Sequence, residues 1–383
     1  MRLLLLATLF VCGVVPFASA GRFVCYFPNW AIQRQEPWQF GVENVDTKLC
    51  THLVYAFADL DDSTLQITPN NPAVDIDQEF YHKFTGLKSQ NPKLKTMLSI
   101  GGWVDSNIND KYSRMVSTSE NIQTFVDSVL RMLSDYGFDG LDVDWEYPRT
   151  DADKIGFSNL LAALKKAFAP YNYVLSAAVS PLPADLGFDI PAIEVSVDFI
   201  NLMTYDLHGP WEPETADHHA PLRKRSWETA DNNVEYSVDY WIKNGLSANK
   251  INLGLPLYGH SWKLSSDVAV PPAPASGAGT PGPFTNVEGY MGYFEICLAV
   301  QNEGWQVVQD PDQLTGPYAL SNTNVVNWIG FDDVAMLTTK SNFILSRGLG
   351  GAMVWEISLD DFRGSCGAGV NPLLTTISRI VVA

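Results

Sequence analysis

Basic residues are scarce in this 383-residue sequence. It has 25 lysines and arginines against 43 aspartates and glutamates, which leaves a formal net charge of −18. A surface this negative repels phosphate backbones and anionic lipid headgroups, so nucleic acid and membrane surfaces are poor candidates for partners. Charged residues make up only 18% of the chain and hydrophobic residues 46%. This composition argues against disorder and favours a large apolar core.

Long apolar segments are missing after the first twenty residues. The N-terminus itself begins with Met1 and Arg2, continues with the apolar run 3–15 and reaches the small residues 18–20. This order is typical of a secretory signal peptide, because the apolar run is shorter than the about 20 residues of a membrane-spanning helix. We therefore expect residues 1–20 to be removed and the remaining chain to be secreted, extracellular and free of the membrane.

Cysteine is also rare. Cys12 lies in the predicted signal peptide, and none of the remaining four cysteines has a C-x-x-C spacing, so neither a zinc site nor a thioredoxin-like site is supported. We expect no metal ion and no cofactor. An even number of cysteines in an oxidising compartment suggests two disulfides, and the sequence alone permits three pairings. The four cysteines are Cys25, Cys50, Cys297 and Cys366.

Short apolar runs recur along the chain and alternate with segments of helical periodicity. This alternation indicates βα units and a parallel sheet. Eight such units favour closure into a barrel, because closure leaves no exposed strand edge. The predicted fold class is therefore α/β, a (β/α)₈ TIM barrel. Its strands are predicted at 23–27, 52–57, 96–100, 140–144, 174–179, 199–204, 251–256 and 351–355.

The interval between the last two predicted strands is too long for one helix and two loops. It begins with a stretch rich in Pro, Gly, Ala and Ser at 271–283, which predicts an extended loop, and continues with β-prone apolar residues. We expect a small α+β insertion subdomain at about 260–336, between strand 7 and helix 7. Residues 21–383 would then form one catalytic barrel that carries this insertion.

Four acidic residues cluster around the fourth predicted strand: Asp139, Asp142, Asp144 and Glu146. Side chains alternate along a strand, so the last three share a face at intervals of about 6.6 Å. In a barrel covered by helices this face looks inward, and Glu146 would lie at the C-terminal mouth, where barrel enzymes keep their catalytic groups. Crowded, desolvated carboxyls have raised pKa values. A carboxylic acid that stays protonated near neutral pH can serve a glycosidase as proton donor.

Two other interpretations of these acids are weaker. A calcium loop carries its ligands among Gly and Asn turns, whereas here Leu141, Val143 and Trp145 alternate with the acids. A solvent-exposed edge strand would not have such apolar neighbours. Because unpaired acids are costly to bury, we favour a functional row of carboxylates.

The spacing of the four acids resembles the D-x-x-D-x-D-x-E signature of glycoside hydrolase family 18, the chitinases and chitinase-like lectins. The likeness extends over the whole mature chain, through segments that resemble strand ends of that family at 26–30, 52–57, 99–103, 203–209, 254–259, 279–284 and 348–355. It implies chitin or chitooligosaccharides as the substrate and disulfides that join Cys25 to Cys50 and Cys297 to Cys366. We expect a monomer.

The resemblance also implies a substrate-assisted, retaining reaction, in which the 2-acetamido oxygen of the sugar attacks its own anomeric carbon. Glu146 resembles the acid/base, and Asp144 the group that binds the acetamido N–H and stabilises the oxazolinium ion. Asp142 and Asp139 would be inner partners that share protons with Asp144. Tyr205 and Asp206 resemble the groups that orient the acetamide.

Further residues near strand ends resemble positions that bind sugar in this family, with Trp355 as the floor of the catalytic subsite. They are Tyr26, Trp30, Phe57, Gly102, Trp103, Met203, Trp211, Tyr258, His260, Glu288, Met353 and Trp355. Two positions depart from the family. His260 stands where arginine is usual, which removes a permanent charge and a bidentate donor. Val104 and Asp105 follow Trp103 where asparagine is common, so we expect altered contacts at both places.

All four acids are present, which favours an active chitinase that cuts within chains of its substrate. A chitinase-like lectin that binds chitin oligomers without cleaving them is the alternative from another functional class. An endo-β-N-acetylglucosaminidase that acts on glycoprotein glycans would share the same carboxylates.

Overall fold

Eight parallel strands form a closed barrel in the computed structural model, which describes residues 21–182, 186–226, 228–229 and 231–382. Parallel pairing of β1 with both β2 and β16 closes the sheet. The predicted fold class is confirmed, and each predicted strand has its counterpart. The barrel strands are β1 (Arg22–Pro28), β2 (His52–Leu60), β4 (Lys95–Gly101), β5 (Gly140–Asp144), β6 (Val174–Val179), β7 (Phe199–Leu202), β9 (Ile251–Pro256) and β16 (Gly351–Trp355). The short β3 (Ile67–Pro69) pairs antiparallel with β2.

Amphipathic helices cover the outside of the barrel. In α4 the apolar residues Ile122, Phe125, Val129 and Leu133 are buried at intervals of three and four, which places them on one face of the helix. The side chain of Thr118 caps its first turn. The covering helices are α1 (Phe80–Gly86), α4 (Ser119–Tyr136), α5 (Asp151–Phe168), α6 (Ile190–Ser196), α7 (Val234–Lys243), α9 (Val334–Ser346) and α10 (Pro372–Val381).

Short helical turns fill the connections. Two of them, α2 (Gly102–Asn107) and α3 (Lys111–Met115), follow β4. Only 3-10 turns follow β1 in place of a barrel helix. The remaining turns are η1 (Asn29–Gln33), η2 (Val42–Asn44), η3 (Ala73–Asp77), η4 (Leu87–Ser89), η5 (Ala169–Tyr171), η6 (Ala248–Lys250) and η7 (Ile357–Leu359).

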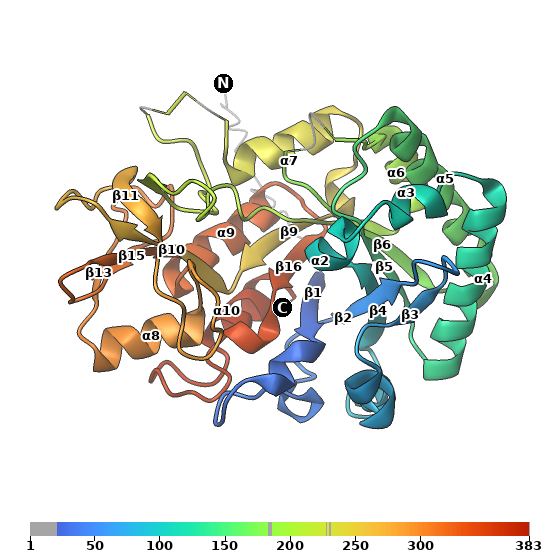
Figure 1. Cartoon of the computed structure of the whole chain (residues 1–383), viewed down its shortest axis with the longest axis horizontal. Helices are drawn as coiled ribbons and strands as arrows, with labels where there is room; N and C mark the ends of the chain where they lie inside the picture. The colour runs from blue at the N-terminus through green and yellow to red at the C-terminus, as the bar shows by residue number, and fades with distance from the viewer. Residues whose placement is uncertain (1–20, 183–185, 227, 230, 383) are drawn as a thin grey trace, which may run out of the picture.

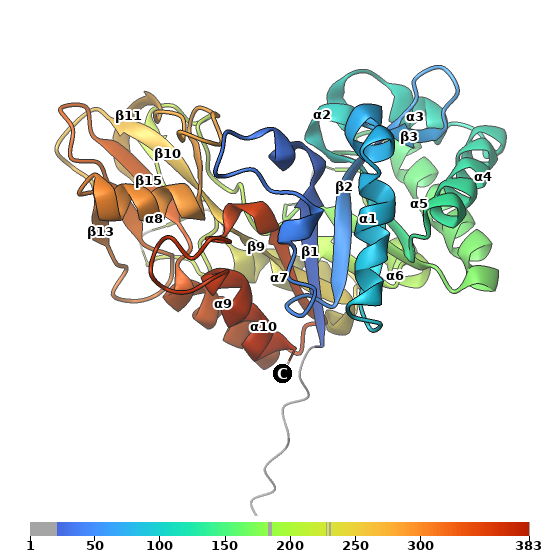
Figure 2. The same ribbon diagram turned by 90° about the horizontal axis from the view of Figure 1, so that it is seen from below.

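A second, antiparallel sheet is built mainly from the segment between β9 and α9. Figures 1 and 2 show it as an orange lobe on one side of the barrel, across the molecule from α4 and α5. The strand order is β13-β14-β15-β10-β11-β8, and β12 pairs with β10. The elements are β8 (Thr215–Ala216), β10 (Tyr258–Leu264), β11 (Ala273–Ala278), β12 (Tyr290–Gly292), α8 (Tyr293–Asn302), β13 (Gln306–Val308), β14 (Tyr318–Leu320) and β15 (Asn327–Phe331).

Both implied disulfides are confirmed. Cys25 on β1 is bonded to Cys50, with Cα atoms 6.2 Å apart. Cys297 on α8 is bonded to Cys366, with Cα atoms 5.9 Å apart, and this bond ties the insertion to the loop after β16. The predicted signal peptide lies outside the described residues. Among the helices that are described, none combines the length and the apolar character needed to cross a membrane.

Candidate active site

Side chains along β5 alternate between two faces, and its acids share the inward face, as predicted. Asp142 and Asp144 are buried inside the barrel, at 0% and 3% exposure, and Glu146 lies just beyond the carboxyl end of the strand. The outward residue Trp145 packs against Tyr112 and Phe157, which belong to α3 and α5. The inward face of β5 is therefore polar because it belongs to the site, while its outward face is part of the apolar core.

Asp142 lies at the centre of a buried hydrogen-bond network. Its Oδ2 accepts from the hydroxyls of Tyr26 at 2.7 Å and Ser99 at 2.8 Å. Its Oδ1 accepts from Ser176 at 2.6 Å and from the Asn201 amide at 3.2 Å. Burial raises the pKa of Asp142, and these four donors lower it in part. Because every donor comes from a different barrel strand, the strands hold this carboxyl in one orientation.

Asp144 and Glu146 have environments that disfavour ionisation. Burial raises the pKa of Asp144 well above its ordinary value, and the neighbouring acids Glu146 and Asp142 raise it further. Burial likewise raises the pKa of Glu146 to about 7, where a hydrogen bond with Tyr147 lowers it and the charge of Asp206 raises it. Asp144 Oδ1 is buried and has no hydrogen-bond partner within the described chain. A buried acceptor of this kind needs a donor, which a bound ligand can supply.

The helical turn α2 positions the backbone around these acids. The Ser106 hydroxyl accepts from the Glu146 N–H at 3.0 Å and donates to the Asp144 carbonyl at 3.4 Å. The Asn107 amide donates to the Glu146 carbonyl at 3.1 Å. The chain turn that carries Glu146 is thus fixed to the turn that follows β4.

The structure does not place Asp139 with the other three acids. Asp139 lies before the amino end of β5, where it accepts from the Thr96 N–H at 2.8 Å and from Lys88 Nζ at 3.0 Å. Lys95 Nζ lies 3.8 Å away. The expectation that Asp139 shares protons with Asp144 is wrong, because the two residues lie at opposite ends of the strand.

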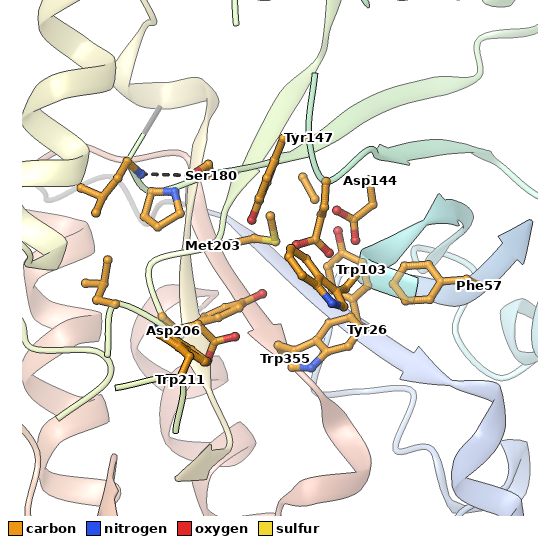
Figure 3. A pocket seen from close by; sticks show the side chains of 16 residues that line it. Tyr26, Phe57, Trp103, Asp144, Tyr147, Ser180, Met203, Asp206, Trp211 and Trp355 are labelled. Atoms are coloured by element: carbon orange, nitrogen blue, oxygen red, sulfur yellow. Dashed lines mark hydrogen bonds between the residues drawn. The ribbon is translucent and has the colours of Figure 1, made fainter. Parts of the chain in front are cut away.

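A pocket of about 740 Å³ opens at the carboxyl ends of the barrel strands. Figure 3 shows Asp144, Tyr147, Met203 and Asp206 around it, with Trp355 and Trp211 on its walls. Ten of the predicted site residues line it: Tyr26, Phe57, Trp103, Asp144, Glu146, Met203, Tyr205, Asp206, Trp211 and Trp355. Six lining residues were not predicted: Tyr147, Ala178, Ser180, Pro181, Leu182 and Leu207.

Half of the unpredicted lining residues directly follow a barrel strand. Residues 180–182 come directly after β6, and Tyr147 is the neighbour of Glu146. The rule that barrel enzymes build their sites from strand ends therefore points to them, although their residue types carry no chemical signal.

Aromatic rings form the walls of the pocket. Trp355 stacks with Phe57 at 5.7 Å between centroids, and Trp30 stacks with Phe57 at 6.1 Å. Trp30, Trp103 and Trp211 are unusually exposed, at 40%, 59% and 60%. A second hollow of about 460 Å³ also contains Trp30 and Trp355, so the cleft continues past Trp355 on that side. Exposed aromatic surface of this kind marks a binding site for a ligand with apolar faces.

Several predicted contacts lie behind the pocket wall. The Tyr205 hydroxyl lies 3.7 Å from the sulfur of the fully buried Met353. At Gly102 an added Cβ would come within 2.6 Å of the Phe57 ring, so this glycine is needed for ring packing. These two residues, Met353 and Gly102, support lining residues and are not themselves part of the pocket lining.

Asp206 is the centre of a polar cluster beside the pocket. Its Oδ1 accepts from the Tyr258 hydroxyl at 2.5 Å, lies 2.8 Å from His260 Nε2 and 3.5 Å from His219 Nδ1. Burial would raise the pKa of Asp206, but His260 and His219 outweigh it and hold the pKa far below the ordinary range. Tyr258 and His260 do not line the pocket, and they act on it through Asp206.

Two further positions that the sequence singled out do not line the pocket. Glu288 is exposed in the loop between β11 and β12 and lines neither the pocket nor the second hollow. Asp105 is buried and forms an ion pair with Lys111, and it accepts from the Tyr112 hydroxyl at 2.6 Å. Asp105, one of the two residues that differ from the asparagine common in the family, therefore contributes to buried packing beside the pocket. The adjacent Val104 is exposed.

Comparison with known proteins agrees with this geometry. The sequence matches the Glycosyl hydrolases family 18 over residues 22–360. It is 40% identical over 379 residues to Probable chitinase 10 of Drosophila melanogaster, and the match covers 96% of this chain but only 16% of that protein.

Two solved structures share the fold. Catalytic domain 2 of the Group II chitinase of Ostrinia furnacalis has a TM-score of 0.91 at 38% identity, with 94% of this chain and 96% of that chain covered. Human YKL-39, described as a pseudo-chitinase with retained chitooligosaccharide binding, has a TM-score of 0.87 at 36% identity, with 95% and 100% covered.

Proposed function

Because the chain belongs to glycosyl hydrolase family 18, we propose that it is a secreted chitinase that hydrolyses β-1,4-linked N-acetylglucosamine polymers and oligomers with retention of configuration. The observation that supports this most strongly is the pair of acids at the pocket. Glu146 has a pKa of about 7 and can hold a proton near neutral pH. Beside it, Asp144 presents a buried oxygen without a partner in the described chain.

In the proposed first step, the acetamido oxygen of the bound sugar attacks its own anomeric carbon. The bond to the glycosidic oxygen breaks, and Glu146 donates its proton to that oxygen, so the leaving chain departs as an alcohol. Asp144 Oδ1 accepts the acetamido N–H and so holds the acetamide with its oxygen at the anomeric carbon. The nucleophile is already part of the substrate, which removes much of the entropic barrier.

In the second step, Glu146 acts as a base. It takes a proton from water, and the water oxygen attacks the anomeric carbon and reopens the ring, which restores the acetamide. Two inversions leave the configuration unchanged. Tyr205 supports both steps, because its hydroxyl is able to donate to the acetamido oxygen. In the structure this hydroxyl makes a long contact of 3.7 Å with the Met353 sulfur.

A chitooligosaccharide-binding lectin is the second candidate. The exposed tryptophans Trp30, Trp103 and Trp211 would stack against sugar rings whether or not a bond is broken. The human relative YKL-39 is described as binding without catalysis. The intact acid row favours hydrolysis, since a lectin has no use for a carboxylic acid held protonated at the pocket.

The decisive experiment incubates the purified protein and its Glu146→Gln variant with N-acetylglucosamine oligomers and follows the products by NMR. We expect the parent to release β-anomers first and the variant to lose about 10²-fold to 10⁴-fold in rate. Binding without cleavage by the parent would support the lectin, and initial α-anomers would contradict the mechanism. Cleavage of a high-mannose glycopeptide in preference to chitotriose would instead indicate the endo-β-N-acetylglucosaminidase.

A further inference from the structure

Two histidines and a carboxylate converge beside the pocket from three separate parts of the chain. Asp206 follows β7, His219 follows β8 and His260 lies on β10. The ligand atoms that they offer all lie within 4.8 Å of one another. His219 is fully buried and the His260 side chain is 8% exposed, whereas the Asp206 side chain is 47% exposed. The cluster is therefore closed on the protein side and open toward the pocket.

Backbone carbonyls orient both imidazoles toward Asp206. His260 Nδ1 lies 3.0 Å from the Gly289 carbonyl, and His219 Nε2 lies 3.2 Å from the Tyr258 carbonyl. A carbonyl oxygen can only accept, so each of these nitrogens carries a ring proton. The other nitrogen of each ring, His260 Nε2 and His219 Nδ1, points toward Asp206, where it presents a lone pair if the imidazole is neutral and a second N–H if the imidazole is protonated.

These contacts bring two ring nitrogens to one carboxylate oxygen. His260 Nε2 lies 2.8 Å from Asp206 Oδ1, and His219 Nδ1 lies 3.5 Å from the same oxygen. The Asp206 N–H reaches His219 Nδ1 only at 3.5 Å. With neutral imidazoles this arrangement places three acceptors together, and a cation would relieve it. A proton on His260 Nε2 would satisfy the contact between His260 and Asp206, whereas a metal ion would satisfy all three groups at once.

We propose that Asp206, His219 and His260 form a binding site for a divalent transition-metal ion of the zinc class. Zinc accepts neutral imidazole nitrogens and carboxylate oxygens at about 2.0–2.2 Å, which places tetrahedral ligands about 3.3–3.6 Å apart. The separation of 3.5 Å between His219 Nδ1 and Asp206 Oδ1 lies within this range, and the separation of 2.8 Å between His260 Nε2 and the same oxygen is shorter. Calcium and magnesium prefer all-oxygen ligand sets, so the two nitrogens select against them.

The surroundings of the three ligands have the form found around metal sites. Metal-binding histidines usually donate their second ring N–H to a carbonyl or carboxylate, as both do here, and metal-binding carboxylates are held by further hydrogen bonds. The Tyr258 hydroxyl holds Asp206 in this way. Three protein ligands would leave a fourth position open to a water or ligand, and Asp206 is the one of the three that lines the pocket.

The test is calorimetric titration of the full chain, cleared of metal by a chelator and dialysed, with zinc chloride at neutral pH. We expect one ion per chain. His219→Asn and His260→Arg should each weaken binding by at least about 100-fold, since even the loss of a supporting hydrogen bond costs a metal site 10–100-fold. The matched control is His82→Asn, an exposed histidine on α1 that should leave zinc affinity unchanged.

Two results would overturn the site: no stoichiometric zinc binding by the parent, or unchanged affinity in both ligand variants. Circular dichroism identifies a variant that fails to fold. The zinc affinity of the other ligand variant then tests the site. Co²⁺ provides a separate readout, because four-coordinate cobalt gives strong visible absorption bands that should appear in the parent and in His82→Asn and be absent from His260→Arg.

A bound ion would occupy Asp206 Oδ1, so we expect zinc to weaken chitooligosaccharide binding at the pocket. This consequence rests on the proposed function, whereas the metal titration does not. Chitotetraose can be titrated into Glu146→Gln with and without saturating zinc. Unchanged sugar affinity in zinc-loaded protein would refute the competition and leave the site standing, and absence of sugar binding in both samples would instead count against the proposed function.

Discussion

At the scale of single residues, the proton on Glu146 sets the expected pH dependence. Burial raises its pKa to about 7, and the proposed acid works only while protonated. We therefore expect kcat/KM for chitotriose to fall about tenfold per pH unit above pH about 7. A steady-state pH profile checks this. A rate that stays level up to pH about 9 would show that another group donates the proton.

The same raised pKa affects stability. A carboxyl whose folded pKa exceeds its unfolded pKa stabilises the protein below the unfolded value, and this contribution is lost as pH rises through the folded value. The melting temperature of the parent should consequently decline between pH about 5 and 8. In Glu146→Gln the decline should be smaller, because the substituted amide has no charge to bury. An equal decline in both proteins would assign it to other groups.

Ser176 allows the network around Asp142 to be tested without touching the pocket. It is fully buried, donates to Asp142 Oδ1 at 2.6 Å and does not line the pocket. Hydrogen bonds to charged groups contribute about 1.5–3 kcal/mol. Ser176→Ala should therefore lower kcat by about 10-fold or more and leave KM nearly unchanged. Ser341→Ala, a buried serine on α9, is the matched control and should retain kcat; equal losses in both would point to general destabilisation.

Alternation along a strand explains which residues could be predicted. Asp142, Asp144 and Glu146 occupy even positions and share the inward face, which the sequence alone indicates. Asp139 occupies an odd position before the strand. Its assignment to the acid row came from the D-x-x-D-x-D-x-E signature and not from strand alternation, and that assignment was wrong. His219 could not be predicted, because it meets Asp206 and His260 only through the fold. Glu288 was placed by resemblance alone, and it lines neither the pocket nor the second hollow, although its loop neighbours Asn286 and Val287 line the second hollow.

At the scale of elements, the insertion is held to the barrel by the Cys297–Cys366 bond. This bond closes a loop with a sequence separation of 69, for which the chain-entropy estimate is about 4.4 kcal/mol. Cys297→Ser with Cys366→Ser should lower the free energy of unfolding by about that amount in urea titrations. The pair Cys25→Ser with Cys50→Ser, at a separation of 25, should cost slightly less, about 3.5 kcal/mol. A larger loss from the shorter loop would contradict the entropic ranking.

Helices and strands could be predicted from hydrophobic periodicity wherever one face of the element is buried and the other is not. Barrel strands are apolar on their outer face and bounded by loops, so all eight were predictable. The insertion was predictable as a region, yet its strand order was not. In particular, β8 joins that sheet from a loop of the barrel, about 60 residues away from β11 in sequence. Short strands such as β8 are defined by pairing partners that local sequence does not reveal.

At the scale of the whole molecule, the net charge of −18 favours binding of deacetylated substrate, whereas the proposed reaction cannot cleave it. Chitosan is cationic, so the negative protein should attract it at low ionic strength. Its sugars lack the acetamido oxygen that the proposed reaction uses as nucleophile. We expect fully deacetylated oligomers to inhibit hydrolysis of chitotriose without being cleaved themselves.

Salt distinguishes the electrostatic attraction of chitosan from the requirement for an acetamide in hydrolysis. Raising the ionic strength about tenfold, to 0.2 M, shortens the screening length to below about 10 Å and should weaken inhibition by chitosan while leaving hydrolysis of neutral chitotriose nearly unchanged. With partly acetylated chitosan, every new reducing end should carry an acetamide, which mass spectrometry can determine. Reducing ends without an acetamide would mean that a protein carboxylate attacks the anomeric carbon, and Asp144 would then be the nucleophile instead of the partner of the acetamido N–H.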